Sequence, residues 1–211
     1  MRRSPVSEPS SIAVVVFAMT PVGHYHRLRP LIGGLVADGH AVTVATHRRF
    51  QGSVEELGAD FLDLFDELHP DTLDPVSEPP PLRCVTFAAA AADAVTERVG
   101  ELAPDVIVYD TFAVIGRVVA NALDVPHVNV CAGHDRFPAR VIEAYRVDTR
   151  VNVSPACAAA VEQLRSVHGL EDASFLSWVT GVSPHLNVYC EPPSFLSEEG
   201  REAFEPIAFF G

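Results

Sequence analysis

Short apolar runs alternate with longer helical segments along almost the whole chain, and this alternation strongly constrains the fold. The runs are rich in Val and Ile, which suits strands buried on both faces of a parallel sheet. Strand–helix–strand repetition is typical of βαβ units. We therefore expect an α/β fold, a Rossmann-like doubly wound parallel sheet of about seven strands flanked by helices. Strands are expected at Ile12–Phe17, Ala41–Ala45, Asp60–Leu64, Asp105–Tyr109, His127–Val130, Leu186–Tyr189 and Ile207–Phe210. Helices are expected at His26–Asp38, Phe50–Leu57, Leu82–Leu102, Phe112–Leu123 and Ser154–His168, near Asp172–Thr180, and as a short charged helix before Ile207.

The net charge of the chain excludes some classes of binding partner. The 211 residues carry a formal net charge of −13, and all fifteen basic residues are Arg. Such an acidic surface repels phosphate backbones and anionic lipids, so neither nucleic acid nor a membrane is an expected partner. The apolar run after the polar residues 1–10 is too short for a membrane span and lacks a signal-peptide cleavage site. We expect a disordered tail over 1–10, one domain over 11–211 and a cytoplasmic location.

The four cysteines share no CxxC spacing and fall on separate expected elements. A metal site or a disulfide framework needs closer or more regular spacing than this. We expect buried free thiols at Cys84, Cys131, Cys157 and Cys190.

Two Gly-His pairs, Gly23-His24 and Gly39-His40, bracket the first expected helix. His24 follows the carboxyl end of a buried strand, where open α/β sheets bind their ligands. His40 lies in the turn that returns the chain to the sheet, so we expect it to anchor that turn. Within the helix, Gly33-Gly34 lowers helix propensity, and a close approach of the helix to the sheet would explain the missing side chains.

Asp110 is the expected partner of His24. In the strand order 3-2-1-4-5 the first and fourth strands are neighbours, so their carboxyl ends bring His24 and Asp110 to one crevice. A His beside a carboxylate is a general base with a fixed tautomer and a stabilised imidazolium. Two other interpretations stay open: Asp110 could simply cap the next helix, and the His24-x-His26 spacing could indicate a metal, although no third ligand follows.

Several functional signatures are absent from the chain. It has no GxGxxG after the first strand, no GxxxxGK[ST] loop and no GxSxG elbow. We therefore expect no pyrophosphate-binding motif in this chain. This excludes an ordinary dinucleotide-dependent oxidoreductase. Two long loops, 65–81 and 131–140, would instead project from the sheet edge that carries His24, and loops of this length are usually functional or mobile.

Five segments of the chain stand out together. They are Pro21-Val-Gly-His-Tyr-His-Arg-Leu-Arg-Pro-Leu, Leu35-Val-Ala-Asp-Gly-His-Ala-Val-Thr, Ala103-Pro-Asp-Val-Ile-Val-Tyr-Asp-Thr-Phe, Leu123-Asp-Val-Pro-His-Val-Asn-Val and Phe204-Glu-Pro-Ile-Ala-Phe-Phe-Gly. These segments resemble family 1 glycosyltransferases of bacterial natural-product (macrolide and polyketide) biosynthesis. The resemblance implies the N-terminal, acceptor-binding half of a GT-B fold. It also implies an inverting enzyme of antibiotic biosynthesis, hexosyltransferase in type, which moves a (deoxy)sugar from a nucleoside diphosphate sugar to a hydroxyl of a hydrophobic natural product.

The resemblance also assigns residues. It implies that His24 is the catalytic base and Asp110 its orienting acid, with no cofactor and no metal. The segment 79–87 and the segment 134–137 match regions that line the acceptor pocket in this family. The implied acceptor-binding residues are Tyr25, Phe87, Phe112, His134 and Phe137.

Three departures from the family pattern qualify these expectations. Arg27 stands where the family commonly has Pro, and His26 is a possible rival base. The glycine-rich nucleotide-sugar signature of the family's C-terminal domain is not in these residues, and the chain ends on an apolar strand, as at a domain boundary. We expect it to need that domain, or a separate donor subunit, for activity. The alternatives are a non-catalytic helper module that binds an aglycone or a partner, and a GT-B enzyme acting on a lipid or cell-wall precursor, which the acidic charge disfavours.

Overall fold

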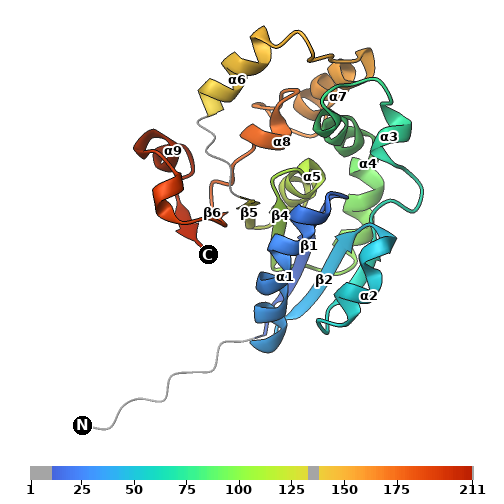
Figure 1. The fold of residues 1–211 in the computed structure, drawn as a ribbon. Helices are drawn as coiled ribbons and strands as arrows, with labels where there is room; N and C mark the ends of the chain where they lie inside the picture. Colours follow the sequence, from blue (N-terminus) through green and yellow to red (C-terminus); the bar gives the residue numbers. More distant parts are fainter. Residues whose placement is uncertain (1–10, 133–137, 211) are drawn as a thin grey trace.

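A seven-stranded parallel sheet forms the centre of the molecule, in the order β3-β2-β1-β4-β5-β6-β7 (Figure 1). This computed structural model describes residues 11–132 and 138–210. The sheet confirms the expected fold class and strand order, and every strand lies within two residues of its expected bounds. The strands are β1 (Ala13–Phe17), β2 (Ala41–Thr46), β3 (Asp60–Asp63), β4 (Val106–Asp110), β5 (His127–Cys131), β6 (Leu186–Tyr189) and β7 (Ile207–Phe209).

The helices fill the connections between successive strands, as βαβ units require. They are α1 (Val22–Ala37), α2 (Gln51–Glu55), α3 (Pro70–Leu73), α4 (Arg83–Gly100), α5 (Val114–Leu123), α6 (Pro138–Val147), α7 (Pro155–Ser166), α8 (Ser177–Thr180) and α9 (Glu198–Ala203). Helix α8 is shorter than the segment expected near Asp172–Thr180. Helices α3 and α6 are additions, since neither has a periodic apolar pattern long enough to be recognised.

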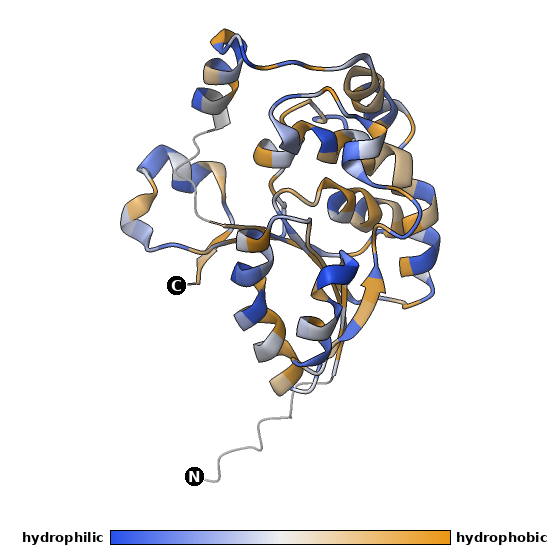
Figure 2. Ribbon diagram, turned by 45° about the vertical axis from the view of Figure 1, so that its right-hand side comes forward, coloured by the Kyte–Doolittle hydropathy of each residue, from blue (hydrophilic) through white to orange (hydrophobic). Residues whose placement is uncertain are grey.

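Alternate residues of each strand pack on opposite faces of the sheet. Val14 and Val16 of β1 join the core under α1 and α2, whereas Val15 and Phe17 join the core under α4, α5, α7 and α8. Hydrophobic colour accordingly concentrates in the strands and in the faces of the helices around them (Figure 2). Burial on both faces explains why the strands read as continuous apolar runs rather than alternating ones.

Gly116 is the position where a helix presses most closely on the sheet. A Cβ on Gly116 would lie 2.6 Å from Cβ of Tyr109 and 3.1 Å from Cβ of Phe17. The expectation of such an approach at Gly33-Gly34 was wrong: a Cβ on Gly33 would only touch Leu57, and one on Gly34 would meet open space. Helix α5 therefore fixes β1 and β4 next to each other.

The cysteine expectation is confirmed, because all four cysteines are free and buried. Within the described ranges, no helix combines the length and the apolar character needed to cross a bilayer.

A candidate active site at the carboxyl ends of β1 and β4

His24 lies in the first turn of α1, directly after β1. The helix begins at Val22, four residues before its expected start, with extended Pro21 as its N-cap. Pro21 fits this boundary, where no backbone N–H donor is needed. The early start places the imidazole on a helix rather than on a loop, and the helix restricts its rotamers.

Asp110 is the last residue of β4, next to the strand that precedes His24. Parallel pairing sets Phe17 of β1 beside Tyr109 of β4. The two side chains then meet, with His24 Nδ1 2.6 Å from Asp110 Oδ1. Asp110 is not a helix cap, since α5 begins only at Val114 and its N-cap residue, Ala113, makes no side-chain capping bond.

Burial dominates the electrostatics of Asp110. Only 2% of its side chain is exposed, against 13% for His24. This desolvation raises the pKa of the Asp110 carboxyl, and the hydrogen bond from His24 opposes the rise. With Nδ1–H donated to the carboxylate, the lone pair of a neutral ring lies on Nε2. The pair of His24 and Asp110, which we call the dyad, has the geometry of a general base and its orienting acid.

The other two histidines near α1 have different positions. His26 is exposed and lies two residues further along the helix, about 200° around its axis from His24. His40 Nδ1 accepts the backbone N–H of Ile12 at 3.4 Å, as expected of a residue that anchors the turn. In the described part of the chain, no group of three or more His, Cys, Asp or Glu side chains is arranged to hold a metal ion.

Phe112 is the expected acceptor residue that lies beside His24. Their ring centroids are 4.0 Å apart, and Phe112 in turn makes an edge contact with Trp178 at 5.1 Å. Trp178 contacts Tyr145 of α6 at 5.8 Å. This aromatic row joins α6, α8 and the dyad. No sequence motif indicates Trp178, because a single Trp in a short helix carries no periodic signal.

Two other expected acceptor residues are buried elsewhere. Tyr25 is 1% exposed and stacks on Phe50 in the core under α1, so it does not line a surface beside His24. Its position one residue after His24 turns it about 100° around the helix, toward the sheet. Phe87 is fully buried in α4 and packs on Phe65. The remaining two, His134 and Phe137, lie outside the described residues.

A small cavity of about 80 Å³ lies next to Phe112. Its wall comes from the loop after β1, from α3 and from residues at and just before the start of α4. The last group is Pro80, Pro81 and Cys84, which fall in the expected segment 79–87. A larger hollow of about 340 Å³ lies between the β3–α3 loop and α4, and its described lining does not include Phe112. Neither His24 nor Asp110 is in the described lining of either cavity, but Phe112, whose ring contacts His24, lines the smaller one. We call this smaller cavity the dyad pocket. Its described lining is Met19, Thr20, Pro21, His69, Pro70, Asp71, Pro80, Pro81, Cys84 and Phe112.

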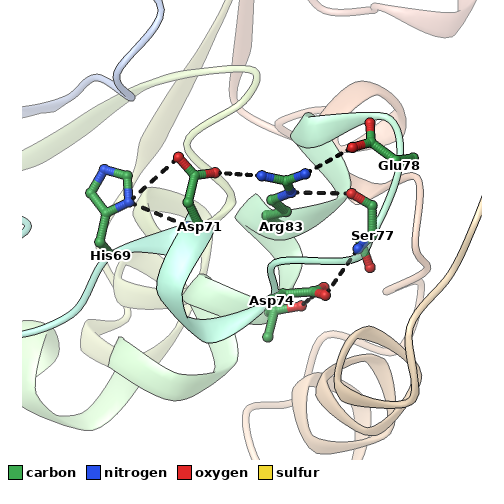
Figure 3. Close-up of polar contacts among 7 residues, drawn as sticks. His69, Asp71, Asp74, Ser77, Glu78 and Arg83 are labelled. Atoms are coloured by element: carbon green, nitrogen blue, oxygen red, sulfur yellow. Dashed lines mark hydrogen bonds and ion pairs between the residues drawn. The ribbon is translucent and has the colours of Figure 1, made fainter.

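Arg83 holds one wall of the dyad pocket in place. Its guanidinium donates to Asp71, Glu78 and the carbonyl of Ser77, as Figure 3 shows. Asp74 is 1% exposed and accepts from Thr86 and from the backbone of Ser77. The long loop before α4 is therefore fastened to the domain rather than free.

Arg27 also has a structural partner. It donates to the carbonyl of Cys190 at 2.7 Å and pairs with Glu191 at 2.5 Å. The Arg in place of the family's Pro thus ties α1 to the carboxyl end of β6.

Comparisons with known proteins bear on the fold and the class of protein. Over 116 residues the chain is 28% identical to the NDP-glycosyltransferase YjiC of Bacillus subtilis (strain 168), a match that covers 53% of this chain and 30% of that protein. CalG4, the calicheamicin glycosyltransferase, superposes with a TM-score of 0.74 at 23% identity, over 96% of this chain and 52% of its own. The chain has the fold of half a GT-B glycosyltransferase.

Further solved glycosyltransferases share this half fold. The kitacinnamycin glycosyltransferase has a TM-score of 0.67 at 22% identity, covering 91% of this chain and 50% of its own. SnogD from Streptomyces nogalater has a TM-score of 0.58 at 20% identity, covering 91% and 48%. No protein-family model matches the chain. The chain is thus homologous to a glycosyltransferase over about half its length and spans about half of each of these solved chains.

Proposed function

We propose that this chain is the N-terminal, acceptor-binding half of an inverting glycosyltransferase. The full enzyme would transfer a (deoxy)sugar from a nucleoside diphosphate sugar to a hydroxyl of a hydrophobic natural product. The observation that carries the proposal is the 2.6 Å contact between His24 and Asp110 at the sheet edge, beside the dyad pocket. The glycosyltransferase homology supports the reaction class.

The chemistry follows from the pair. Nε2 of His24 takes the proton of the acceptor hydroxyl as that oxygen attacks the anomeric carbon. The bond from this carbon to the diphosphate breaks, and the diphosphate leaves with the electron pair. Attack from the face opposite the leaving group inverts the anomeric configuration. Asp110 stabilises the imidazolium that forms, as carboxylate partners of catalytic histidines do. The proposed step uses no cofactor or metal.

The proposed partners follow from the half fold. The nucleotide sugar would be held by a C-terminal domain or a separate donor subunit, because this chain has no phosphate-binding signature. Without that second half, we expect acceptor binding and no sugar transfer.

Calorimetric titration of this chain tests the domain assignment. We expect polycyclic polyketide aglycones to bind and dTDP-glucose not to bind. Binding of dTDP-glucose without the aglycone would reverse the assignment. The helper-module alternative is tested by adding a donor domain from a related glycosyltransferase and following sugar transfer: transfer that His24→Ala abolishes contradicts a non-catalytic role.

A further inference from the structure

The dyad pocket has an uneven distribution of polarity. Its wall is mostly apolar, from Pro, Met and Phe side chains and the Cys84 thiol. Among the described lining residues, Asp71 is the only carboxylate and no Arg takes part. A ligand that complements this wall has an apolar body and one group that meets a carboxylate.

The negative charge at Asp71 is only partly balanced. Its Oδ1 accepts from Arg83 at 2.8 Å, but the same guanidinium pairs with Glu78 at 2.9 Å. Asp74 is close enough that, with Asp71 and Glu78, it raises the pKa of Arg83. Asp71 and Glu78 thus share one guanidinium, so Arg83 is not a partner for Asp71 alone.

Asp74 remains ionised in this cluster. Burial alone would raise the pKa of its carboxyl, but side-chain hydrogen bonds from Ser77, Ser154 and Thr86 bring it below the ordinary value. Asp74 therefore carries its negative charge at neutral pH, on the same segment as Asp71.

His69 lies next to Asp71 at the start of α3 (Figure 3). Its Nδ1 accepts the backbone N–H of Asp71 at 3.3 Å and so caps the helix. The same Nδ1 lies 3.7 Å from Oδ2 of Asp71. The carboxylate of Asp71 therefore has Arg83 and His69 as neighbours and also lines the pocket.

The pocket connects Asp71 with the dyad. Phe112 contacts the His24 ring and lines the same cavity as Asp71. Cys84 lines the same cavity, and its pKa is raised first by burial and then by the carboxylates of Asp110 and Asp71. Through Phe112, the cavity that Asp71 lines therefore reaches the His24 ring.

We propose that the acceptor carries a protonated amine that pairs with Asp71 while its apolar body fills the dyad pocket. This assignment rests on the proposed function, since it takes the dyad pocket as part of the acceptor site. An aliphatic amine has a pKa near 10 and is a cation at neutral pH. Asp71 is then a specificity-determining residue that favours amines and repels carboxylates.

A matched probe series tests the proposal on this chain. Tyramine, 4-ethylphenol and 3-(4-hydroxyphenyl)propanoic acid share a phenol ring and differ in the charge of the tail. Binding is followed by quenching of Trp178, the single Trp, whose ring lies 5.1 Å from Phe112. A partly exposed ion pair is worth up to about fivefold in affinity. We expect tyramine to bind about that much more tightly than 4-ethylphenol, and the acid to bind most weakly.

Asp71→Asn should remove this order and leave the affinity of 4-ethylphenol unchanged, which also shows that the pocket has kept its shape. Asp66→Asn is the matched control, because Asp66 is similarly exposed and pairs with Arg48 but does not line the pocket. Equal binding of the three probes to the unmodified chain, or an amine preference that survives Asp71→Asn, would overturn the proposal and leave the proposed function standing. No binding by any probe, together with no binding of polyketide aglycones, would overturn both.

Discussion

His24 and Asp110 are separated by 86 residues in the sequence, and their side chains meet at 2.6 Å. Two neighbouring parallel strands bring them together, and α5 presses on both strands at Gly116. The geometry of the pair therefore depends on the packing of the sheet as well as on the residues at its edge.

Removing the proposed base, His24, should abolish most of the activity and leave acceptor binding nearly intact. In the enzyme with both halves, we expect His24→Ala to lower kcat by about 10²–10⁴-fold, the contribution typical of a positioned general base. Calorimetry on the isolated chain checks that aglycone affinity changes little. His26→Ala is the matched control, and unchanged turnover in His24→Ala with a loss in His26→Ala would transfer the base role to His26.

Asp110→Asn should reduce turnover less than His24→Ala and should not lower thermal stability at pH 7. Burial raises the folded-state pKa of Asp110 above its unfolded value, so folding favours the protonated acid. The ionised form therefore reduces the free energy of unfolding as the pH rises between the two pKa values. Asn retains an acceptor for His24 without the buried charge. A melting temperature several degrees lower would show that the ion pair stabilises the fold.

Gly116→Ala should destabilise the domain by about 1–3 kcal/mol, the usual effect of an added carbon in a packed core. The reason is the 2.6 Å approach to Cβ of Tyr109. The control is Gly34→Ala in α1, where the added carbon meets open space. That variant should stabilise the helix by about 0.5–1 kcal/mol. Urea unfolding of both variants measures the difference, and equal effects would contradict the described packing.

His127 should make the domain sensitive to acid. Burial, followed by the charges of His185 and Arg117, lowers the pKa of His127 to about 4. Because the unfolded residue takes up its proton near pH 6.5, the free energy of unfolding should fall by about 2–3 kcal/mol between pH 6.5 and 4. His127→Phe should flatten this dependence in urea titrations, whereas His26→Gln, an exposed His, should not.

Arg83→Lys should loosen the wall of the dyad pocket although it keeps the charge. An ammonium cannot reproduce the guanidinium fork that reaches Asp71, Glu78 and the Ser77 carbonyl together. We expect faster amide hydrogen exchange across the loop 65–82 with little change in the strands. Unaltered exchange in that loop would mean that other contacts, such as the pairing of Glu78 with Asn152, suffice.

The sequence predicted the sheet almost completely, because strands buried on both faces leave uninterrupted apolar runs such as Val14–Phe17. It also placed His24 and Asp110 together, since the expected doubly wound order sets the first and fourth strands side by side. The first result depends on the apolar pattern within each strand, and the second depends on the order of the strands in the sheet.

Contacts made by side chains were less predictable. Tyr25 was expected in the acceptor site, but the helix starts at Val22 and turns this ring toward Phe50. The positions of Trp178 and Asp71 beside Phe112 and its pocket depend on how α8 and α3 pack, and no periodicity encodes that packing. The tight approach lies at Gly116 rather than at Gly33-Gly34, since a glycine pair alone does not tell which neighbour comes close.

The loop before α4 is held to the domain by only a few contacts, and this has a consequence for engineering. Arg83, Asp74 and the Glu78–Asn152 bridge hold the loop at defined points, while other residues of the same loop face the pocket. A loop exchanged between relatives should therefore fold in its new domain when the residues of these three contacts are exchanged together with it. Such an exchange would change the residues that line the dyad pocket, while β1, β4 and the His24–Asp110 pair stay as they are.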